Sequence, residues 1–225
     1  MQNRTMGIYV GFDPGGIGGF GWAVVSGEKF PLRLIGCGIA DHAQGAFNAA
    51  MDCAGSKVNA VGIDAPLFWS EAGDRSADRI VRKAITRLGA YGATVIPVNA
   101  LRGACLIQGI LVAMPYRRRL TDRVLITESH PKALLWLLGK ATPERHPRDL
   151  TLNDLNEYVV ENGVQGASDH ERDAALGAVG AFAAESRLPG WQNLYVLEPN
   201  PITPLDPPPG YWMPLNPEPG NPVGN

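Results

Sequence analysis

Two short apolar runs in this chain each lead into an aspartate. Residues 7–13 read GIYVGFD and residues 58–65 read VNAVGIDA, and both have the length and apolar character of strands buried in a sheet. A helix expected over residues 42–55 would cross between them and leave the two strands side by side and parallel. Their carboxyl ends, with Asp13 and Asp64, would then meet at the edge where ligands of open α/β sheets bind.

The remaining pattern predicts a mixed α/β fold. Residues 20–27 and 31–39 each read as a strand, so the chain opens with an antiparallel three-strand meander. Residues 124–128 predict a fifth, buried strand. Because buried strands alternate with helices after the meander, we expect a five-stranded sheet with helices on both faces. The expected helices cover residues 42–55, 74–88, 101–114, 131–138, 151–161 and 169–187, with a short edge strand at 93–98.

The C-terminal end of the chain is rich in proline. Ten of the 19 prolines fall in residues 199–225, and proline removes a backbone donor from helices and sheets. We therefore expect one domain over residues 1–190 and a tail over residues 191–225 that forms no helix or sheet interior. The tail would either wander in solvent or lie extended over a surface. The sequence lacks the features of a signal peptide and any apolar run near the ~18 residues that span a bilayer, so we expect a cytoplasmic protein without membrane attachment. Three cysteines without a CxxC motif predict reduced thiols rather than a disulfide or zinc site.

Basic residues gather in one part of the chain. Residues 74–123 hold ten of the 20 Lys and Arg but three of the 22 Asp and Glu, in a chain of net charge −2. Such a block suits a phosphate-bearing substrate. A second interpretation, in which the basic residues between 79 and 87 form only the solvated side of a helix, stays open. The expected phosphate contacts are arginines, whose fork suits phosphate oxygens: Arg75, Arg79, Arg117, Arg118 and Arg119.

The strand-ending aspartates indicate a metal site. Burying a carboxylate without a partner is costly, so Asp13 and Asp64 each need a cation or hydrogen bonds. Two neighbouring carboxylates repel, and a divalent cation removes that repulsion. Oxygen ligands favour Mg²⁺ or Mn²⁺ over zinc. Taken singly, each aspartate is also explained as a turn or cap residue before a proline.

A third acidic group lies in the segment DHERDAAL, residues 169–176. His170 and Asp173 are three residues apart and share one face of the expected helix. Two alanines follow Asp173, so the helix can approach the sheet closely there. Asp169 is four residues before Asp173 and also shares this face, although the dipole at the helix N-terminus is an alternative explanation for it. Glu171 is explained by the helix dipole. We therefore expect Asp173 and His170 to join the site.

Two further features have two interpretations each. Glu128 ends the strand at 124–128, where it would either be a further metal ligand or help to cap the helix that begins at Pro131. The glycine-rich stretch 15–21 either permits a tight hairpin or lets a nucleic-acid backbone approach Asp13. It matches neither GxGxxG nor the P-loop pattern, and no GxSxG occurs, so nucleotide-binding and serine-hydrolase motifs are not indicated.

Several segments carry a family resemblance. GFDPGGIGGFGWAVV and HERDAAL resemble parts of the Holliday-junction resolvases, where Asp-Pro-Gly and a later Gly-Trp frame the first catalytic carboxylate. Over residues 7–187 the chain is more similar to a family of predicted nucleases with an RNase H-like fold, domain of unknown function four-two-nine. The similar elements are Gly11 and Asp13 with Gly21 and Trp22, Ile63 to Pro66, Arg75 with Asp78 and Arg79, Glu128 with Ser129 and Pro131, and His170 with Asp173 and Ala174.

The resemblance implies a two-metal nuclease that hydrolyses phosphodiester bonds. By position, Asp13, Asp64 and Asp173 would bind the metal ions, and His170 would be a further ligand or a proton-transfer group. The resolvases usually have glutamate where this chain has Asp64, and they lack the insert at 74–119. Specificity for four-way junctions is therefore not carried over.

Two other functions are left open by the sequence. An ATP-dependent phosphotransferase of the actin and sugar-kinase type shares this fold, but it needs two such domains, and this chain has one glycine-rich hairpin. A non-catalytic nucleic-acid-binding protein could keep the fold without using the carboxylates. The expected partner is nucleic acid, DNA or RNA, and the sequence does not decide whether the chain forms a homodimer.

Overall fold

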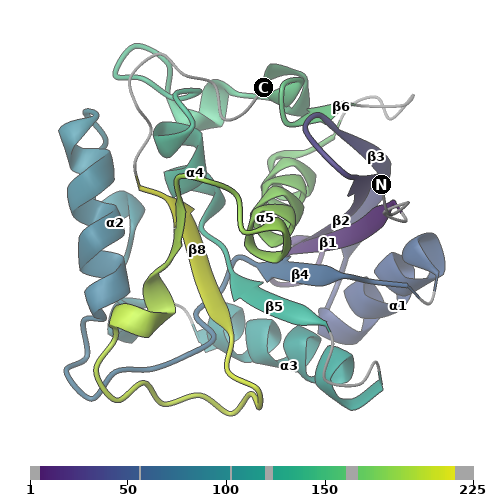
Figure 1. The fold of residues 1–225 in the computed structure, drawn as a ribbon, viewed down its shortest axis with the longest axis horizontal. Helices are drawn as coiled ribbons and strands as arrows, with labels where there is room; N and C mark the ends of the chain where they lie inside the picture. The colour runs from purple at the N-terminus through teal and green to yellow at the C-terminus, as the bar shows by residue number, and fades with distance from the viewer. Residues whose placement is uncertain (1–5, 56, 102, 120–123, 161–166, 216–225) are drawn as a thin grey trace.

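The computed structural model describes residues 6–55, 57–101, 103–119, 124–160 and 167–215. They form an eight-stranded mixed sheet in the order β6-β3-β2-β1-β4-β5-β8-β7, with helices packed on it (Figure 1). The strands are β1 Gly7–Asp13, β2 Phe20–Gly27, β3 Leu32–Ala40, β4 Ala60–Ile63, β5 Leu125–Glu128, β6 Val159–Val160, β7 Trp191–Asn193 and β8 Gly210–Pro214. The helices are α1 Ala43–Ala54, α2 Ser76–Arg87, α3 Gly103–Arg119, α4 Pro131–Leu137 and α5 Asp169–Ser186.

The five strands expected from the sequence lie next to one another. β1 pairs antiparallel with β2 and β2 with β3, so the opening meander is confirmed. β4 lies parallel to β1, and β5 parallel to β4, as the crossing helices required. The predicted number of five strands is wrong, because β6 adds to β3 at one edge and β8 and β7 extend the other.

Residues 191–214 contribute two of the additional strands, β7 and β8, so the expectation that this segment forms no sheet interior is wrong. β8 lies between β5 and β7. The prolines at positions 207–209 precede the strand, and residues 210–213 read GYWM, which leaves their backbone donors available for pairing. The boundary predicted at residue 190 thus falls between α5 and a strand of the same sheet, and residues 216–225 lie outside the described residues.

Two local predictions are wrong. The edge strand expected at 93–98 is a pair of short 3-10 helices, Gly92–Thr94 and Val98–Ala100, in a region that Pro97 makes unsuitable for a ladder. The helix expected at 151–161 is one 3-10 turn, Leu152–Leu155, followed by β6. Val159 and Val160 of β6 are β-branched, and they pair with the edge strand β3 instead of continuing a helix.

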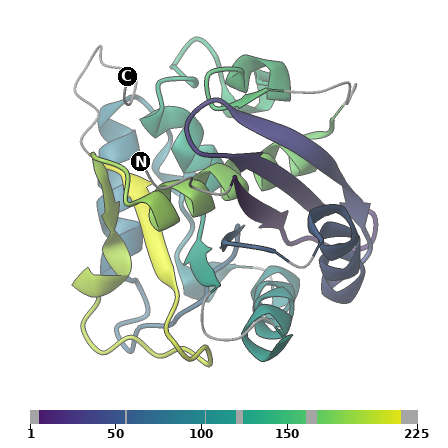
Figure 2. The same ribbon diagram turned by 45° about the vertical axis from the view of Figure 1, so that its right-hand side comes forward.

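Helices cover both faces of the sheet, as expected. α5 packs on one face and α1 and α3 on the other (Figures 1 and 2). Alternate residues of β1 serve the two layers: Tyr9 meets Phe182 of α5 edge-on at 5.2 Å, and Phe12 meets Tyr116 of α3 at 6.0 Å between ring centroids. Within the described chain, no helix combines the length and apolar character needed to cross a membrane.

Glycines let α5 lie unusually close to the central strands. A Cβ atom on Gly11 of β1 would lie 1.8 Å from the backbone oxygen of Ala174, and one on Gly62 of β4 would lie 1.9 Å from that of Gly177. Both contacts are far below van der Waals distance, so only glycine allows this approach. The N-terminal turn of α5, with His170 and Asp173, is thereby held over the carboxyl ends of β1 and β4.

Replacing Gly62 with alanine should therefore destabilise the protein. The added methyl group meets rigid backbone rather than a movable side chain, so α5 and β4 must separate. We expect the free energy of unfolding to fall by about 1–3 kcal/mol, measured by denaturant unfolding. Gly16, whose added Cβ would meet nothing within 4 Å, supplies the control: Gly16→Ala should leave stability nearly unchanged. Equal stability of Gly62→Ala and the wild type would contradict the close approach.

Candidate active site

A pocket of about 180 Å³ opens where β1, β4 and β5 end. Asp13 is the last residue of β1, Asp64 follows β4, and Glu128 is the last residue of β5. All three line the pocket, together with Lys132 of α4 and residues of the segment between β4 and α3. The sheet edge predicted to carry the site is therefore the edge that is hollowed.

Asp64 carries the least compensated charge of this pocket. Among the described residues, no hydrogen bond or ion pair reaches its carboxylate. Burial raises the pKa of Asp64 well above its ordinary value, and the charges of Asp13 and Asp173 raise it further. Lys132 acts in the opposite direction without cancelling these effects. The folded chain thus holds Asp64 close to other carboxylates without supplying a bonded partner.

Asp13 is paired with the histidine of α5. Nδ1 of His170 lies 2.6 Å from Oδ2 of Asp13, which joins the end of β1 to the first turn of α5. This hydrogen bond raises the pKa of His170 and favours the protonated ring as the donor, against the opposing effect of burial. The pairing of these two predicted site residues leaves Nε2 of the histidine and Oδ1 of the aspartate for other partners.

Asp173 lies on the same helix and is held by its neighbour in sequence. Nε and Nη2 of Arg172 donate to Oδ1 of Asp173 at 2.9 and 2.6 Å, and both side chains are buried. Arg172 is anchored in turn by the backbone oxygens of Pro147 and Leu150. Burial raises the pKa of Asp173 to about 6, although Arg172 opposes the shift. The other oxygen, Oδ2, faces Lys132 at 4.0 Å.

These carboxylates fit a divalent cation by chemistry. Asp64 lacks a partner, Asp13 and Asp173 each keep one oxygen outside their bonds to His170 and Arg172, and oxygen donors of this kind suit Mg²⁺ or Mn²⁺. Within the described residues, however, no group of three or more His, Cys, Asp or Glu side chains is gathered in a metal-binding arrangement. The charges of the three aspartates thus affect one another, but the described residues do not gather them into a formed ligand shell. The metal site stays a prediction.

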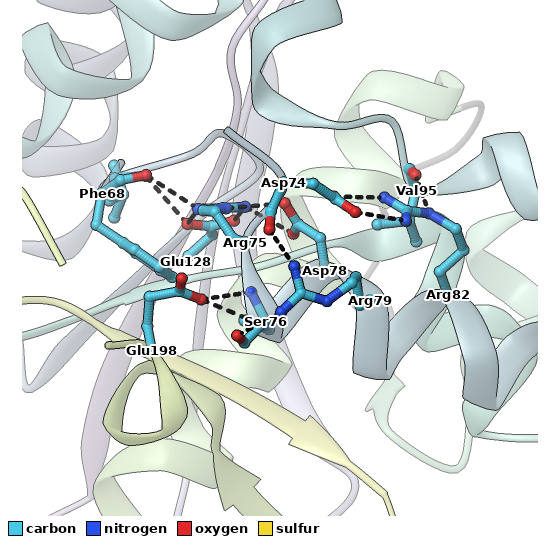
Figure 3. A network of polar contacts seen from close by, with 12 residues as sticks. Phe68, Asp74, Arg75, Ser76, Asp78, Arg79, Arg82, Val95, Glu128 and Glu198 are labelled. Carbon is cyan, nitrogen blue, oxygen red and sulfur yellow. Dashed lines mark hydrogen bonds and ion pairs between the residues drawn. The ribbon is translucent and has the colours of Figure 1, made fainter. Parts of the chain in front are cut away.

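Glu128, a predicted metal ligand, is bound by an arginine instead (Figure 3). Nη1 and Nη2 of Arg75 donate to its two oxygens at 2.7 and 2.6 Å, and the backbone N–H of Leu67 donates at 3.0 Å. Burial raises the pKa of Glu128, while Arg75 lowers it. The carboxylate lines the pocket but already accepts three hydrogen bonds. The alternative of a cap for α4 is not seen either, since no side chain caps that helix.

Arg75 was expected to contact phosphate, and its geometry does not fit that role. Nε and Nη2 donate to Asp78 at 2.8 and 2.7 Å, Nη1 also donates to the backbone oxygen of Phe68, and the guanidinium stacks 4.3 Å above the Phe68 ring. With the two bonds to Glu128, all five N–H groups are in use. The side chain of Arg75 is 2% exposed. Arg75 is therefore the centre of a buried ion cluster that ties α2 to the end of β5.

Three other arginines predicted to contact phosphate, Arg79, Arg117 and Arg118, lie outside the pocket. Arg79 is exposed on α2 and donates to the backbone oxygen of Asp74 and to Ser76. Arg117 donates to the backbone oxygens of Val124 and Pro207. Cys105, near the start of α3, lines the pocket. Arg117 and the exposed Arg118 come at least twelve residues later in the same helix, which places them about 18 Å from Cys105 along the helix axis. The side chain of Arg119 lies outside the described residues.

The glycine-rich stretch closes a tight hairpin between β1 and β2. The backbone N–H of Gly18 donates to Asp41 at 2.9 Å, and Gly18 has φ of 67°, a conformation that favours glycine. A Cβ atom on Gly21 would lie 2.2 Å from the backbone oxygen of His170. Gly18 thus fits the first interpretation, in which glycine permits the hairpin, and Gly21 makes room for α5. The second interpretation, in which glycine lets a nucleic-acid backbone approach Asp13, stays a prediction.

Sequence reasoning missed two residues of the site, Arg172 and Lys132. Arg172 adjoins Asp173 in the same motif, but a charged residue beside an alanine-rich helix face gives no sign that it is buried. Lys132 had a usable signal: it is the second residue of the helix that begins directly after β5, at the sheet edge already assigned to the site. Any side chain there is brought near the strand-ending carboxylates.

The chain is similar to a known protein family and to a solved structure. No curated protein sequence matches the chain. RuvC from Thermus thermophilus is a similar solved structure, with 15% sequence identity, a TM-score of 0.45, and coverage of 80% of this chain and 96% of that chain. The family described as "Protein of unknown function (DUF429)" matches residues 18–185, a range that includes Asp64, Glu128, His170 and Asp173 and begins after Asp13. Because that match covers most of the sequence, this chain belongs to the DUF429 family.

Proposed function

We propose that this chain is a metal-dependent nuclease with an RNase H-like fold, which hydrolyses phosphodiester bonds of DNA or RNA at the pocket between β1, β4 and α5. One observation carries the proposal: Asp64 lies at the end of a central strand, influenced by Asp13 and Asp173, with no bonded partner among the described residues. Keeping such a carboxylate is unfavourable for folding. A role in binding a cation would explain why the protein keeps this buried charge at Asp64.

The fold supports this assignment through its central part. The five strands expected for an RNase H-like sheet are adjacent, in the order β3-β2-β1-β4-β5. Asp13, Asp64 and Asp173 come from β1, the end of β4 and α5, so residues remote in sequence are brought to one edge. A two-domain phosphotransferase receives no such support, since the described strands all belong to one sheet.

The residues divide into binding and positioning roles. Asp13, Asp64 and Asp173 would hold Mg²⁺ or Mn²⁺, which supplies an activated water and neutralises charge on the phosphate when bound. Arg172 orients Asp173 by two hydrogen bonds. His170 orients Asp13 and, as an accessible imidazole at 42% exposure, can accept or deliver a proton at Nε2. Glu128 stays with Arg75 and shapes the wall of the pocket.

A cleavage panel tests the proposal. Purified protein is incubated with single-stranded, double-stranded and branched DNA and RNA, with Mg²⁺, Mn²⁺ or a chelator. We expect cleavage of at least one substrate with metal and none with chelator. Asp13→Asn should lower the rate about 100-fold or more, because it removes a charged ligand and the partner of His170. Asp52→Asn, an exposed position on α1, is the matched control and should cleave like the wild type.

Three results would count against the nuclease. Cleavage that persists with chelator would indicate a different chemistry. Equal cleavage by Asp13→Asn and the wild type would indicate a different site or a contaminating enzyme. Absence of cleavage of every substrate, with intact metal binding, would favour the non-catalytic alternative.

A further inference from the structure

Among the described residues that line the pocket, one cationic side chain has N–H groups without hydrogen-bond partners. Of the two cations that line it in the described chain, Arg75 has every N–H engaged by buried partners. Lys132 differs, because its side chain is 50% exposed and its Nζ lies 4.0 Å from Oδ2 of Asp173. In the described chain, no other ion pair or hydrogen bond reaches this ammonium group.

Lys132 is not needed to hold Asp173. Two hydrogen bonds from Arg172 already fix that carboxylate. The lysine of the pair is half exposed and lies at 4.0 Å, so the pair contributes little to stability. The backbone of Lys132 is fixed, however, since Pro131 begins α4 and the next two residues, Ala133 and Leu134, are buried. A flexible four-carbon stem therefore carries the ammonium from a rigid base at the rim of the pocket.

The charge of Lys132 acts on the carboxylates that would bind metal. It lowers the pKa of both Asp64 and Asp173, against the stronger effect of burial. An ammonium in this place has two consequences: it opposes the binding of another cation nearby, and it attracts an anion that enters the pocket. Lysine is a common binder of phosphate as a point charge.

On the basis of the proposed function, we infer that Lys132 contacts the substrate phosphate in this pocket and, before substrate binds, partly neutralises Asp64 and Asp173. Of the arginines predicted for this contact, Arg75 is fully occupied by other partners, and Arg79, Arg117 and Arg118 lie outside the pocket. The phosphate contact thus comes from α4, directly beyond the strand that ends in Glu128. The binding of metal and the binding of substrate are coupled, because each changes the net charge around the ammonium group of Lys132.

The test measures binding, so it does not depend on turnover. Lys132→Met keeps the apolar stem and removes the charge, Lys132→Arg keeps the charge, and Lys57→Met, an exposed position before β4, is the matched control. Mn²⁺ affinity is measured by calorimetry. Affinity for a short labelled single-stranded oligonucleotide is measured by fluorescence anisotropy in Ca²⁺. We expect Lys132→Met to bind Mn²⁺ about 3- to 10-fold more tightly and the oligonucleotide about 10-fold more weakly.

The two expected changes have opposite signs, which a loss of structure would not produce. Lys132→Arg and Lys57→Met should bind Mn²⁺ like the wild type. The inference is overturned if Lys132→Met binds Mn²⁺ as tightly as the wild type or more weakly. It is also overturned if Lys132→Met binds the oligonucleotide like the wild type, or if the wild type binds no oligonucleotide. If the wild type binds both and the predicted shifts occur without any cleavage, the nuclease proposal fails and the role of Lys132 in binding stands.

Discussion

Replacing Asp64 with asparagine is expected to abolish metal-dependent cleavage and, in the same protein, to raise thermal stability without metal. Cleavage should fall at least about 100-fold, because the carboxylate with no bonded partner is the one best placed to hold the cation. Stability should rise because asparagine keeps the shape of the side chain and removes a charge that burial, Asp13 and Asp173 all disfavour. We expect a gain of about 1 kcal/mol, or about 2–4 °C in Tm for a domain of this size.

The gain in stability should depend on pH in a defined direction. Because the pKa of Asp64 in the folded protein lies well above its ordinary 3.8, ionisation of this carboxyl opposes folding. Below about pH 4 the carboxyl is protonated in both the folded and the unfolded protein, so it does not lower stability. Between that pH and the pKa of the folded state, the loss of stability grows as the pH rises. The difference in Tm between Asp64→Asn and the wild type should therefore be small at pH 3.5 and largest at neutral pH.

Divalent metal should reverse the order of stability. Mg²⁺ or Mn²⁺ binds the folded wild type and raises its Tm by mass action, whereas Asp64→Asn should respond little. Thermal unfolding with chelator and with increasing metal measures both effects, and Asp52→Asn should follow the wild type throughout. A lower Tm for Asp64→Asn than for the wild type in chelator would show that the carboxylate of Asp64 has a stabilising partner. That result would contradict the inference that its charge is uncompensated.

The part of the site that could be predicted rests on strand geometry. Asp13 and Asp64 end apolar runs that are too short for helices, and a helix between the runs requires their strands to be parallel, so both carboxylates reach the same edge. Asp173 follows from the small residues after it, which let α5 approach the sheet. These inferences use periodicity and chain direction, which a single sequence contains.

The parts that were missed depend on tertiary contacts. Arg75 sits in a polar stretch typical of a solvated helix start, and nothing local indicates that Glu128, fifty-three residues later, meets it in the interior. The average proline content of residues 199–225 predicts no sheet interior there, although GYWM at residues 210–213 has the apolar, aromatic character of a strand. Averages over long windows hide a strand of five residues.

Replacing Arg75, the residue directly before α2, with alanine should destabilise the protein far more than replacing Arg79 on the surface of α2. The substitution leaves Glu128 and Asp78 buried side by side without their cation and removes the stacking on Phe68. Breaking a buried ion pair from one side costs about 3–5 kcal/mol, because the remaining charge is uncompensated. Denaturant unfolding should show this loss at pH 7, whereas Arg79→Ala, an exposed neighbour on α2, should change stability by less than about 0.5 kcal/mol.

A double-mutant cycle separates the ion pair from the general loss of packing. Glu128→Gln removes one charge from the cluster, so Arg75→Ala should be less damaging in that background, with a coupling of about 1–3 kcal/mol. An arginine that bound substrate phosphate would behave differently: Arg75→Ala would then weaken oligonucleotide binding and leave unfolding unchanged. The buried forks to Asp78 and Glu128 predict the first outcome, because a guanidinium with five bonded N–H groups has no donor left for a ligand.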